Sequence, residues 1–317
     1  MTILVTGAAG YVGNTIVKRL VVQGKSVRAM THNLEKGQYR LADVRDKIEI
    51  IQGDVTDPTS LEAALQDVTT VVHLVAIAME KGTQTYEAIN YQGTINLVDA
   101  ANKTGVTRFI NMSQNGASSN APYRFLKSKG MAQDYVAKHA PNWTALRPSA
   151  VFGPQDEFFN SIARLVKLTP LVFPLIGGGK AEFQPVFVGD LAEATVRCVD
   201  DESTIGKELL LGGPEVLTLG EIEKRILKTM GARRLLVPAP VTLLRIPVFL
   251  MERLLPNSPV SSSLLDLLAV PNTTPQNALA DHLGIEPTPF SGEHIAYLNN
   301  NSIKATLKKF FTGAIVN

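Results

Sequence analysis

The first half of the chain alternates short apolar runs with longer segments whose apolar residues recur every three or four positions. The short runs predict buried strands, at residues 3–5, 25–32, 47–57, 69–76 and 107–114. The segments between them predict helices, at residues 15–24, 60–68 and 85–105. Strands that alternate with helices form parallel βαβ units. The pattern therefore predicts an α/β fold of the Rossmann type, a doubly wound parallel sheet, followed by a smaller C-terminal subdomain.

The pattern becomes looser after residue 160, and this sets the predicted domain boundaries. Residues 1–160 form the main domain, to which residues 181–212 return, and a smaller substrate or partner subdomain takes residues 161–180 and 213–317. We expect a substrate-side loop at residues 168–180, which three consecutive glycines turn, and a helix capped by Asp190.

An apolar stretch at residues 233–255 allows several interpretations. Its uninterrupted runs are too short to span a bilayer, because three prolines and Arg245 break it. It would line a hydrophobic substrate pocket, lie on a membrane, dock on a partner, or form an ordinary amphipathic core helix. The tail at residues 302–317 combines three lysines with Phe310 and Phe311, which fits attachment to a membrane or a partner as well as a frayed terminal helix.

Composition indicates an ordinary water-soluble protein. The 317 residues carry a formal net charge of +2, which gives no argument for a nucleic-acid partner. Met1 leads almost directly into the first strand, so we expect no secretory signal and place the protein in the cytoplasm or at the periphery of a membrane. The only cysteine, Cys198, permits no internal disulfide and no cysteine-based metal site, and we expect no metal.

Residues 3–13, ILVTGAAGYVG, place three glycines at the turn between the first strand and the first helix. Glycines at this turn let the backbone bend sharply and approach a pyrophosphate, while the first helical N–H groups and the helix dipole bind the anion. The glycine triplet alone is a weak signal, but the strand before it and the helix after it supply the context that the motif requires. The sequence therefore predicts a dinucleotide site.

The end of the second strand favours NADP(H) over NAD(H). In NAD-selective proteins an acidic side chain here accepts hydrogen bonds from the ribose 2′-OH. This chain has Thr31 and His32 there, so no carboxylate repels a 2′-phosphate. His32, Lys36 and Arg28 would attract one, although Arg28 also fits a solvated strand residue and His32 a polar loop residue.

Several segments in order resemble the short-chain dehydrogenase/reductase superfamily: TGAAGYVG, GDVTD, INYQGTINLVDAA, RPSAVFGPQDEFFN and FQPVFVGDLAEA. The chain is most similar to the extended, or atypical, branch, and within it to the group of the NADPH-binding accessory subunit of respiratory complex I. The resemblance covers residues 1 to about 215 strongly and the remainder loosely. Together with the glycine loop it implies these cofactor-binding residues: Thr6, Gly7, Ala9, Gly10, Tyr11, Val12, Gly13, Thr31, His32, Asp54, Val55, Val75, Ala76, Lys129 and Pro148.

Enzymes of this superfamily use a tyrosine as general acid and base, a lysine four residues later that lowers the tyrosine pKa, and a serine or threonine on the substrate oxygen. Ser113 occupies the serine position. For the other two residues the chain offers two alignments. Tyr123 with Lys127 has the required spacing on one helix face, and Phe125 with Lys129 has the same spacing without a hydroxyl.

Residues flanking the lysine favour the second alignment. Relatives read Ser-Lys followed by a small residue, which matches Ser128, Lys129 and Gly130. The two alignments differ by about 200° around a helix, so only one faces the cofactor. In the favoured alignment the usual proton donor is missing, and loss of a general acid costs about 10²–10⁴ in rate.

Other side chains near the nicotinamide region would then have to donate the proton. Tyr86, Tyr91 and His73 are candidates, although His73 also fits a packed strand residue. Asp156 and Glu157, at the edge of the expected substrate cleft, would bind a polar substrate or form a solvated turn. Two functions follow from the sequence. One is an oxidoreductase or isomerase of a small apolar carbonyl or alcohol compound with a non-standard proton donor. The other is a non-catalytic NADPH-binding accessory, assembly or redox-sensing subunit of a larger, membrane-associated complex.

Overall fold

The structure, a computed structural model, describes residues 1–254 and 262–300. Packing divides the chain into two compact units. The first comprises residues 1–148, 188–211 and 276–286, and the second comprises residues 149–187, 212–275 and 287 onward.

The first unit is built on a parallel sheet of seven strands in the order β11-β6-β5-β4-β1-β2-β3. In chain order the strands are β1 (Thr2–Thr6), β2 (Ser26–Thr31), β3 (Glu49–Gln52), β4 (Val68–His73), β5 (Arg108–Met112), β6 (Trp143–Pro148) and β11 (Lys207–Leu211). The chain runs outward from β1 to β3 on one side and then from β4 to β6 on the other. Since ligands bind at the carboxyl ends of the strands where the order reverses, the β1/β4 boundary marks the expected ligand position.

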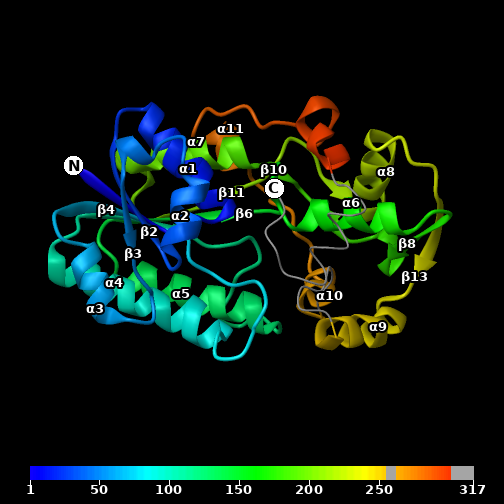
Figure 1. Cartoon of the computed structure of the whole chain (residues 1–317), viewed down its shortest axis with the longest axis horizontal. Coiled ribbons are helices and arrows are strands. Elements are labelled where there is room, and N and C mark those ends of the chain that lie inside the picture. Colours follow the sequence, from blue (N-terminus) through cyan, green and yellow to red (C-terminus); the bar gives the residue numbers. More distant parts are fainter. Residues whose placement is uncertain (255–261, 301–317) are drawn as a thin grey trace. The chain divides into compact units, whose positions relative to one another are not determined.

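Helices connect these strands and cover the sheet. They are α1 (Tyr11–Val22), α2 (Leu34–Arg40), α3 (Pro58–Ala64), α4 (Gly93–Thr104), α5 (Arg124–His139), α7 (Val188–Asp200) and α11 (Ala278–Asp281). Helices α1 and α7 cover one face of the sheet, and α3, α4 and α5 cover the other (Figure 1). The predicted α/β fold of the Rossmann type is confirmed.

Burial on both faces explains why the central strands read as continuous apolar runs. Leu4, Val71 and Phe109, from three neighbouring strands, are fully buried, and Leu97 of α4 packs into the same cluster. Each such side chain stabilises the fold by about 1.5–3 kcal/mol relative to an exposed position. The buried sheet holds the carboxyl ends of its strands in fixed positions. It therefore also positions the site residues that follow those strands.

The predicted helix at residues 85–105 is divided in two. A π-helical segment, Tyr86–Gln92, precedes α4, and the Thr85 side chain caps it by accepting a hydrogen bond from the Ala88 backbone N–H. Segments of π-helix are wider than α-helix and occur often at functional sites. Here the segment places Asn90 in the interior, where the Asn90 side chain bonds both backbone groups of Ile77.

The second unit contains short strand pairs and helices around an aromatic core. Its strands are β7 (Val151–Phe152), β8 (Val172–Ile176), β9 (Glu182–Phe183), β10 (Val186–Phe187), β12 (Leu217–Thr218) and β13 (Leu235–Ala239). Its helices are α6 (Phe158–Leu168), α8 (Leu219–Thr229), α9 (Val241–Leu254) and α10 (Ser262–Leu267). Phe152, Phe159 and Phe290 pack edge to face or tilted, with ring centroids 4.6–6.3 Å apart.

The structure corrects two expectations for this part of the chain. Residues 168–180 were expected to form a loop, but Val172–Ile176 is strand β8, paired in parallel with β13, and only the three glycines after it form a turn. Asp190 was expected to cap a helix, but α7 begins at Val188, so Asp190 lies inside the first helical turn.

The apolar stretch at residues 233–255 forms β13 and α9 as far as residue 254. Within the described ranges, no helix is long and apolar enough to cross a bilayer. The lysine- and phenylalanine-bearing tail at residues 302–317 lies outside the described residues.

Candidate functional site

The glycine loop lies between β1 and α1 and has the geometry of a close-approach turn. Gly7 has a φ of +67°, a region that favours glycine. A Cβ atom on Gly13 would lie 2.2 Å from the Gly7 carbonyl oxygen, so no other residue fits at that position without a shift of the backbone. The loop therefore holds the first turn of α1 tightly against the end of β1.

The N-terminus of α1 is open to an anion. Gly10 is the N-cap residue and supplies no side-chain hydrogen bond, and the first turn contains no acidic residue. The loop is itself closed by the Gly10 N–H, which donates to the Gly7 carbonyl at 2.9 Å. A helix N-terminus of this kind attracts phosphate through its N–H groups and its dipole. Ala9, Tyr11 and Val12 belong to the same turn.

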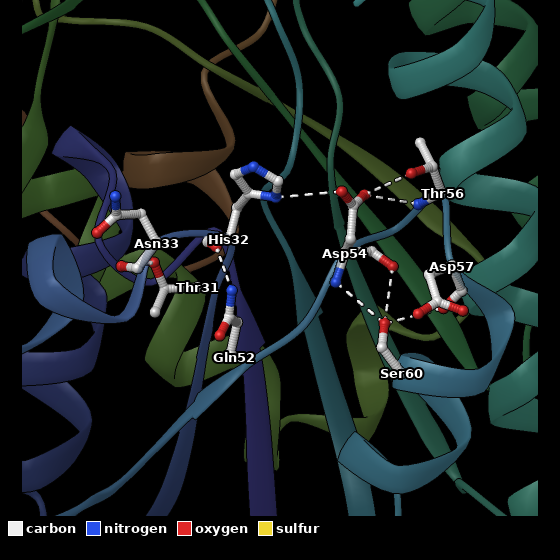
Figure 2. A network of polar contacts seen from close by, with 8 residues as sticks. All are labelled: Thr31, His32, Asn33, Gln52, Asp54, Thr56, Asp57 and Ser60. Carbon is white, nitrogen blue, oxygen red and sulfur yellow. Dashed lines mark hydrogen bonds and ion pairs between the residues drawn. The ribbon is translucent and has the colours of Figure 1, made fainter.

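A polar network lies where β2 and β3 end (Figure 2). His32 extends into solvent with its side chain 73% exposed, and its Nδ1 atom lies 3.1 Å from Asp54 Oδ2. Asp54 Oδ1 accepts hydrogen bonds from the Thr56 backbone N–H and hydroxyl, both at 2.8 Å. Partial burial alone would raise the pKa of Asp54, but the Thr56 hydrogen bonds and the His32 charge outweigh it and lower the pKa.

The end of β2 itself carries no carboxylate. Thr31 is buried, and its hydroxyl donates to the Asn33 carbonyl. Asn33 caps α2 by accepting a hydrogen bond from the Lys36 backbone N–H. His32 and Lys36 both follow this strand end and are exposed.

Arg28 does not join this cluster, contrary to one interpretation of the sequence. It lies in the first half of β2, where its guanidinium pairs with Glu49 at 2.6 Å and donates to the carbonyls of Ala64 and Gln66. Its side chain is 16% exposed, so it is not a solvated strand residue either.

His73, at the end of β4, is a packed strand residue. Its ring nitrogens lie 2.8 Å from the Thr6 hydroxyl and 3.1 Å from the Thr94 hydroxyl. Burial, with a smaller contribution from the Lys129 charge, lowers the pKa of His73 to about 3. A neutral, fully bonded imidazole is a poor proton donor. Val75 and Ala76 continue the chain beyond it, partly buried and exposed respectively.

Helix α5 presents the two lysines to different surroundings. Lys129 is buried, and its Nζ atom donates to the Met112 carbonyl at 2.7 Å, at the end of β5. Burial lowers the pKa of Lys129 to about 8. Lys127 is exposed, and Tyr123 precedes the helix as its N-cap residue. The structure therefore brings Lys129, rather than Lys127, to the strand ends.

Phe125 lies one turn before Lys129 in the protein interior. It is 8% exposed, and its ring packs edge to face on Tyr86 with centroids 5.6 Å apart. The Tyr86 hydroxyl donates to the Ala78 carbonyl at 2.8 Å. The position one turn before the buried lysine thus carries no hydroxyl, and the neighbouring tyrosine already donates its proton to the backbone.

Ser113 follows directly after β5. Its side chain is 4% exposed, and its Oγ atom makes no hydrogen bond within the described part of the chain. An unsatisfied buried hydroxyl costs free energy, about 1–3 kcal/mol, unless a ligand or water completes it. Pro148, the last residue of β6, is also buried and accepts a hydrogen bond from the Asn115 N–H.

Sequence reasoning missed an ion pair beside these residues. Glu80 accepts hydrogen bonds from both terminal nitrogens of Arg124, at 2.7 and 3.0 Å, and from the Tyr86 backbone N–H. The guanidinium lies 5.9 Å from the centroid of the Tyr86 ring. The pair ties the loop after β4 to the start of α5. Only its charges are visible in the sequence, because 44 positions separate the two residues.

In the second unit the expected solvated turn is wrong for Asp156. Its carboxylate is 2% exposed and accepts hydrogen bonds from the Tyr297 hydroxyl at 2.6 Å and from the Phe159 N–H at 2.7 Å. Burial raises the pKa of Asp156 to about 6 despite these bonds. Asp156 thus stabilises the start of α6 and anchors Tyr297, while Glu157 is exposed.

The comparisons with known proteins agree with this geometry. Residues 3–212 match the NAD dependent epimerase/dehydratase family, and this range includes the glycine loop, the β2 end, Ser113 and Lys129. The chain belongs to the NAD dependent epimerase/dehydratase family. The predicted resemblance to extended short-chain dehydrogenases/reductases and to the complex I subunit group is confirmed.

The chain is similar to two curated relatives that carry different names. The chain is 32% identical over 222 residues to NADH dehydrogenase (ubiquinone) 1 alpha subcomplex subunit 9, mitochondrial, of Arabidopsis thaliana. That match covers 69% of this chain and 55% of the plant protein, so it spans little more than half of the relative. The chain is also 28% identical to 3 beta-hydroxysteroid dehydrogenase/Delta 5→4-isomerase of Mycobacterium tuberculosis, over 73% of this chain and 70% of that protein.

Solved structures share the fold of this chain. The UDP-glucose 4-epimerase of Thermus thermophilus, in complex with NAD, superposes with a TM-score of 0.63 at 23% identity. The superposition covers 76% of this chain and 86% of the epimerase. At this identity the likeness concerns the fold alone.

Proposed function

We propose that the chain binds NADP(H) at the carboxyl edge of its first unit and that the nucleotide acts there as a structural or redox-reporting group. In this proposal the chain is not a reductase of the tyrosine-dependent kind. The open N-terminus of α1 holds the pyrophosphate, and Lys129 contributes its positive charge at the other end of the site. A nucleotide that binds only the folded chain stabilises it by about 2.7 kcal/mol at a concentration of 100 Kd.

Phe125 carries the proposal. Proton transfer to a carbonyl oxygen needs a donor within hydrogen-bond reach. The position one turn before Lys129 holds a buried phenyl ring, and Tyr123 lies outside the helix. Nucleotide binding does not depend on that hydroxyl, because it uses backbone N–H groups and the lysine.

The preference for NADP(H) rests on the β2 end. A 2′-phosphate placed there would meet His32 and Lys36, and Asp54 already interacts with His32 and Thr56. Charge complementarity therefore favours the phosphorylated ribose. The solved Thermus thermophilus epimerase holds NAD. The proposed preference for NADP(H) therefore rests only on the side chains at the β2 end of this chain.

The plant relative is named as a subunit of NADH dehydrogenase, and we extend the proposal to association with a larger protein complex. A nucleotide-binding protein that acts as a subunit of such a complex would need no substrate of its own.

A second candidate function is an oxidoreductase or isomerase acting on a small apolar carbonyl or alcohol compound. The unbonded hydroxyl of Ser113 favours it, because Ser113 directly follows Met112, whose carbonyl Lys129 contacts, and its hydroxyl would bond a substrate oxygen. The mycobacterial relative is named as an enzyme. The proton would have to come from a group other than Phe125.

A thermal-shift titration with NADPH and NADH, followed by nicotinamide absorbance against a panel of carbonyl compounds, separates these functions. Stabilisation by NADPH over NADH without turnover supports the proposal. Turnover would establish the second candidate instead. Absence of any shift with either nucleotide would overturn both.

A further inference from the structure

Helix α9 of the second unit is apolar on two opposite sides. One side packs inward through Leu244, Val248 and Met251, which contact Leu265 and Leu268. The opposite side exposes five large apolar residues, Leu243, Ile246, Phe249, Leu250 and Leu254, with exposed fractions of 71%, 72%, 53%, 50% and 77%. These five residues are called the α9 outer face below.

The α9 outer face is a continuous surface. At 3.6 residues per turn its five members lie within an arc of about 140°, opposite the inward-facing side. A helix with a single packed face would carry polar residues there. The α9 outer face is apolar instead, and a contiguous exposed apolar face indicates a binding surface.

Helix α9 carries two basic residues, Arg245 and Arg253, and one acidic residue, Glu252. Glu252 accepts hydrogen bonds from the N–H and hydroxyl of Ser262. Arg253 lies within the arc of the outer face, with its guanidinium 5.8 Å from the centroid of the Phe249 ring. Arg245, at the margin, pairs with Asp266 at 2.7 Å.

The combination fits a lipid surface better than a protein partner. Protein interfaces have an apolar centre with a polar rim of hydrogen-bonding groups. The α9 outer face instead presents aliphatic and phenyl groups with the Arg253 guanidinium over the Phe249 ring; its arc also contains Thr242 and no acidic residue. Helices that lie in the plane of an anionic membrane have this composition, since the arginine reaches lipid phosphates while its neighbours enter the acyl region.

We propose that α9 docks in the plane of an anionic lipid surface, with Leu243, Ile246, Leu250 and Leu254 among the acyl chains and Arg253 at the phosphate groups. The site lies in the second unit and is independent of nucleotide binding. It makes the chain a peripheral membrane protein whether or not the proposed NADP(H) function is correct.

The test is flotation of the full chain with vesicles of phosphatidylcholine alone and of phosphatidylcholine mixed with phosphatidylglycerol. We expect binding to the phosphatidylglycerol vesicles, weakened by salt. The triple variant Leu243→Ser, Ile246→Ser, Leu250→Ser should lower binding by about tenfold or more, because it removes the inserted side chains. Arg253→Gln should lower binding only to the anionic vesicles.

Val22→Ser is the matched control, since Val22 is an apolar residue of the first unit that is 75% exposed. It should leave vesicle binding unchanged. All variants should keep the melting temperature and the nucleotide-induced shift of the parent chain, which shows that they fold. Failure of the parent to float, or flotation that the triple variant does not reduce, would overturn the proposal. A dimer of the parent that the triple variant dissociates, without vesicle binding, would assign the face to a second copy.

Discussion

In the first unit, the strand ends on the two sides of the β1/β4 boundary carry different parts of one candidate site. The side of β1 to β3 carries the glycine turn, the uncapped α1 N-terminus and the His32–Asp54 pair, which we propose as the main part of the dinucleotide site. On the side of β4 to β6, Lys129 and Ser113 are in place, but the ring of Phe125 lies where the proton donor is expected. In the proposed function, binding and proton transfer are separable, because binding uses backbone groups and charge, whereas proton transfer depends on one hydroxyl.

The largest effect is expected on the first side, from Gly10→Asp. An aspartate at the N-cap position is compatible with the helix but places a negative charge where the pyrophosphate binds. We expect NADPH affinity to fall by about 100-fold or more, given the cost of like charges at close range. Isothermal titration calorimetry measures the loss.

The control for this variant is Gly10→Asn, which adds a side chain of the same size without the charge. Both Cβ atoms would lie 3.0 Å from the Gly7 oxygen, so any steric effect is common to the two variants. Retention of full NADPH affinity by Gly10→Asp would remove the basis for a nucleotide site at this loop.

On the second side, Lys129→Met should weaken NADPH binding by about 10- to 100-fold, the usual worth of a hydrogen bond to a charged group. Lys127→Met, two residues away and exposed, should have no effect. Equal losses in the two variants would contradict the choice of Lys129.

The pH dependence of affinity gives a second readout of Lys129. Burial lowers its pKa to about 8, so the free protein loses the ammonium proton as the pH rises through 8. NADPH affinity of the parent should therefore decline between about pH 7 and pH 9, because an anionic ligand then has to bind with uptake of a proton. The Lys129→Met variant should show no such decline.

Much of the first unit was predictable because its signals are local. The strand runs, the glycine turn and the spacing of Phe125 and Lys129 all lie within a few residues of one another. The absence of a tyrosine hydroxyl at Phe125 was predictable for the same reason, because the Ser-Lys-Gly motif at residues 128–130 fixes the alignment from the sequence alone.

Long-range contacts were not predictable in the same way. Asp156 looks like a turn residue in the sequence, and only its contact with Tyr297, 141 positions away, explains its burial. Arg28 was a candidate for the 2′-phosphate by its charge alone, whereas its partners place it away from the strand end. A charge pattern gives the sign of an interaction, but the tertiary fold selects the partner.

A smaller effect is expected from His32→Ala. Removing an exposed imidazole should weaken NADPH binding about two- to fivefold, in keeping with a solvent-screened charge contact, and leave NADH binding nearly unchanged. Arg28→Gln should not alter the NADPH/NADH ratio, because Arg28 pairs with Glu49. The ratio is obtained from parallel titrations at constant ionic strength. A fall in affinity for both nucleotides in His32→Ala would show that His32 does not contact the 2′-phosphate.

The smallest effect on affinity is expected from Phe125→Tyr, and this variant tests the comparison most directly. The ring keeps its edge-to-face packing on Tyr86, so the added hydroxyl should change NADPH affinity by less than about twofold. It restores a proton donor one turn before Lys129, whose charge lowers a nearby phenol pKa. Gain of carbonyl reduction by this variant alone would show that the second side lacks only the hydroxyl.

Tyr123→Phe should leave binding and any activity unchanged, since Tyr123 lies outside α5. A large loss in Tyr123→Phe would instead reverse the assignment and place the chemistry on the first alignment.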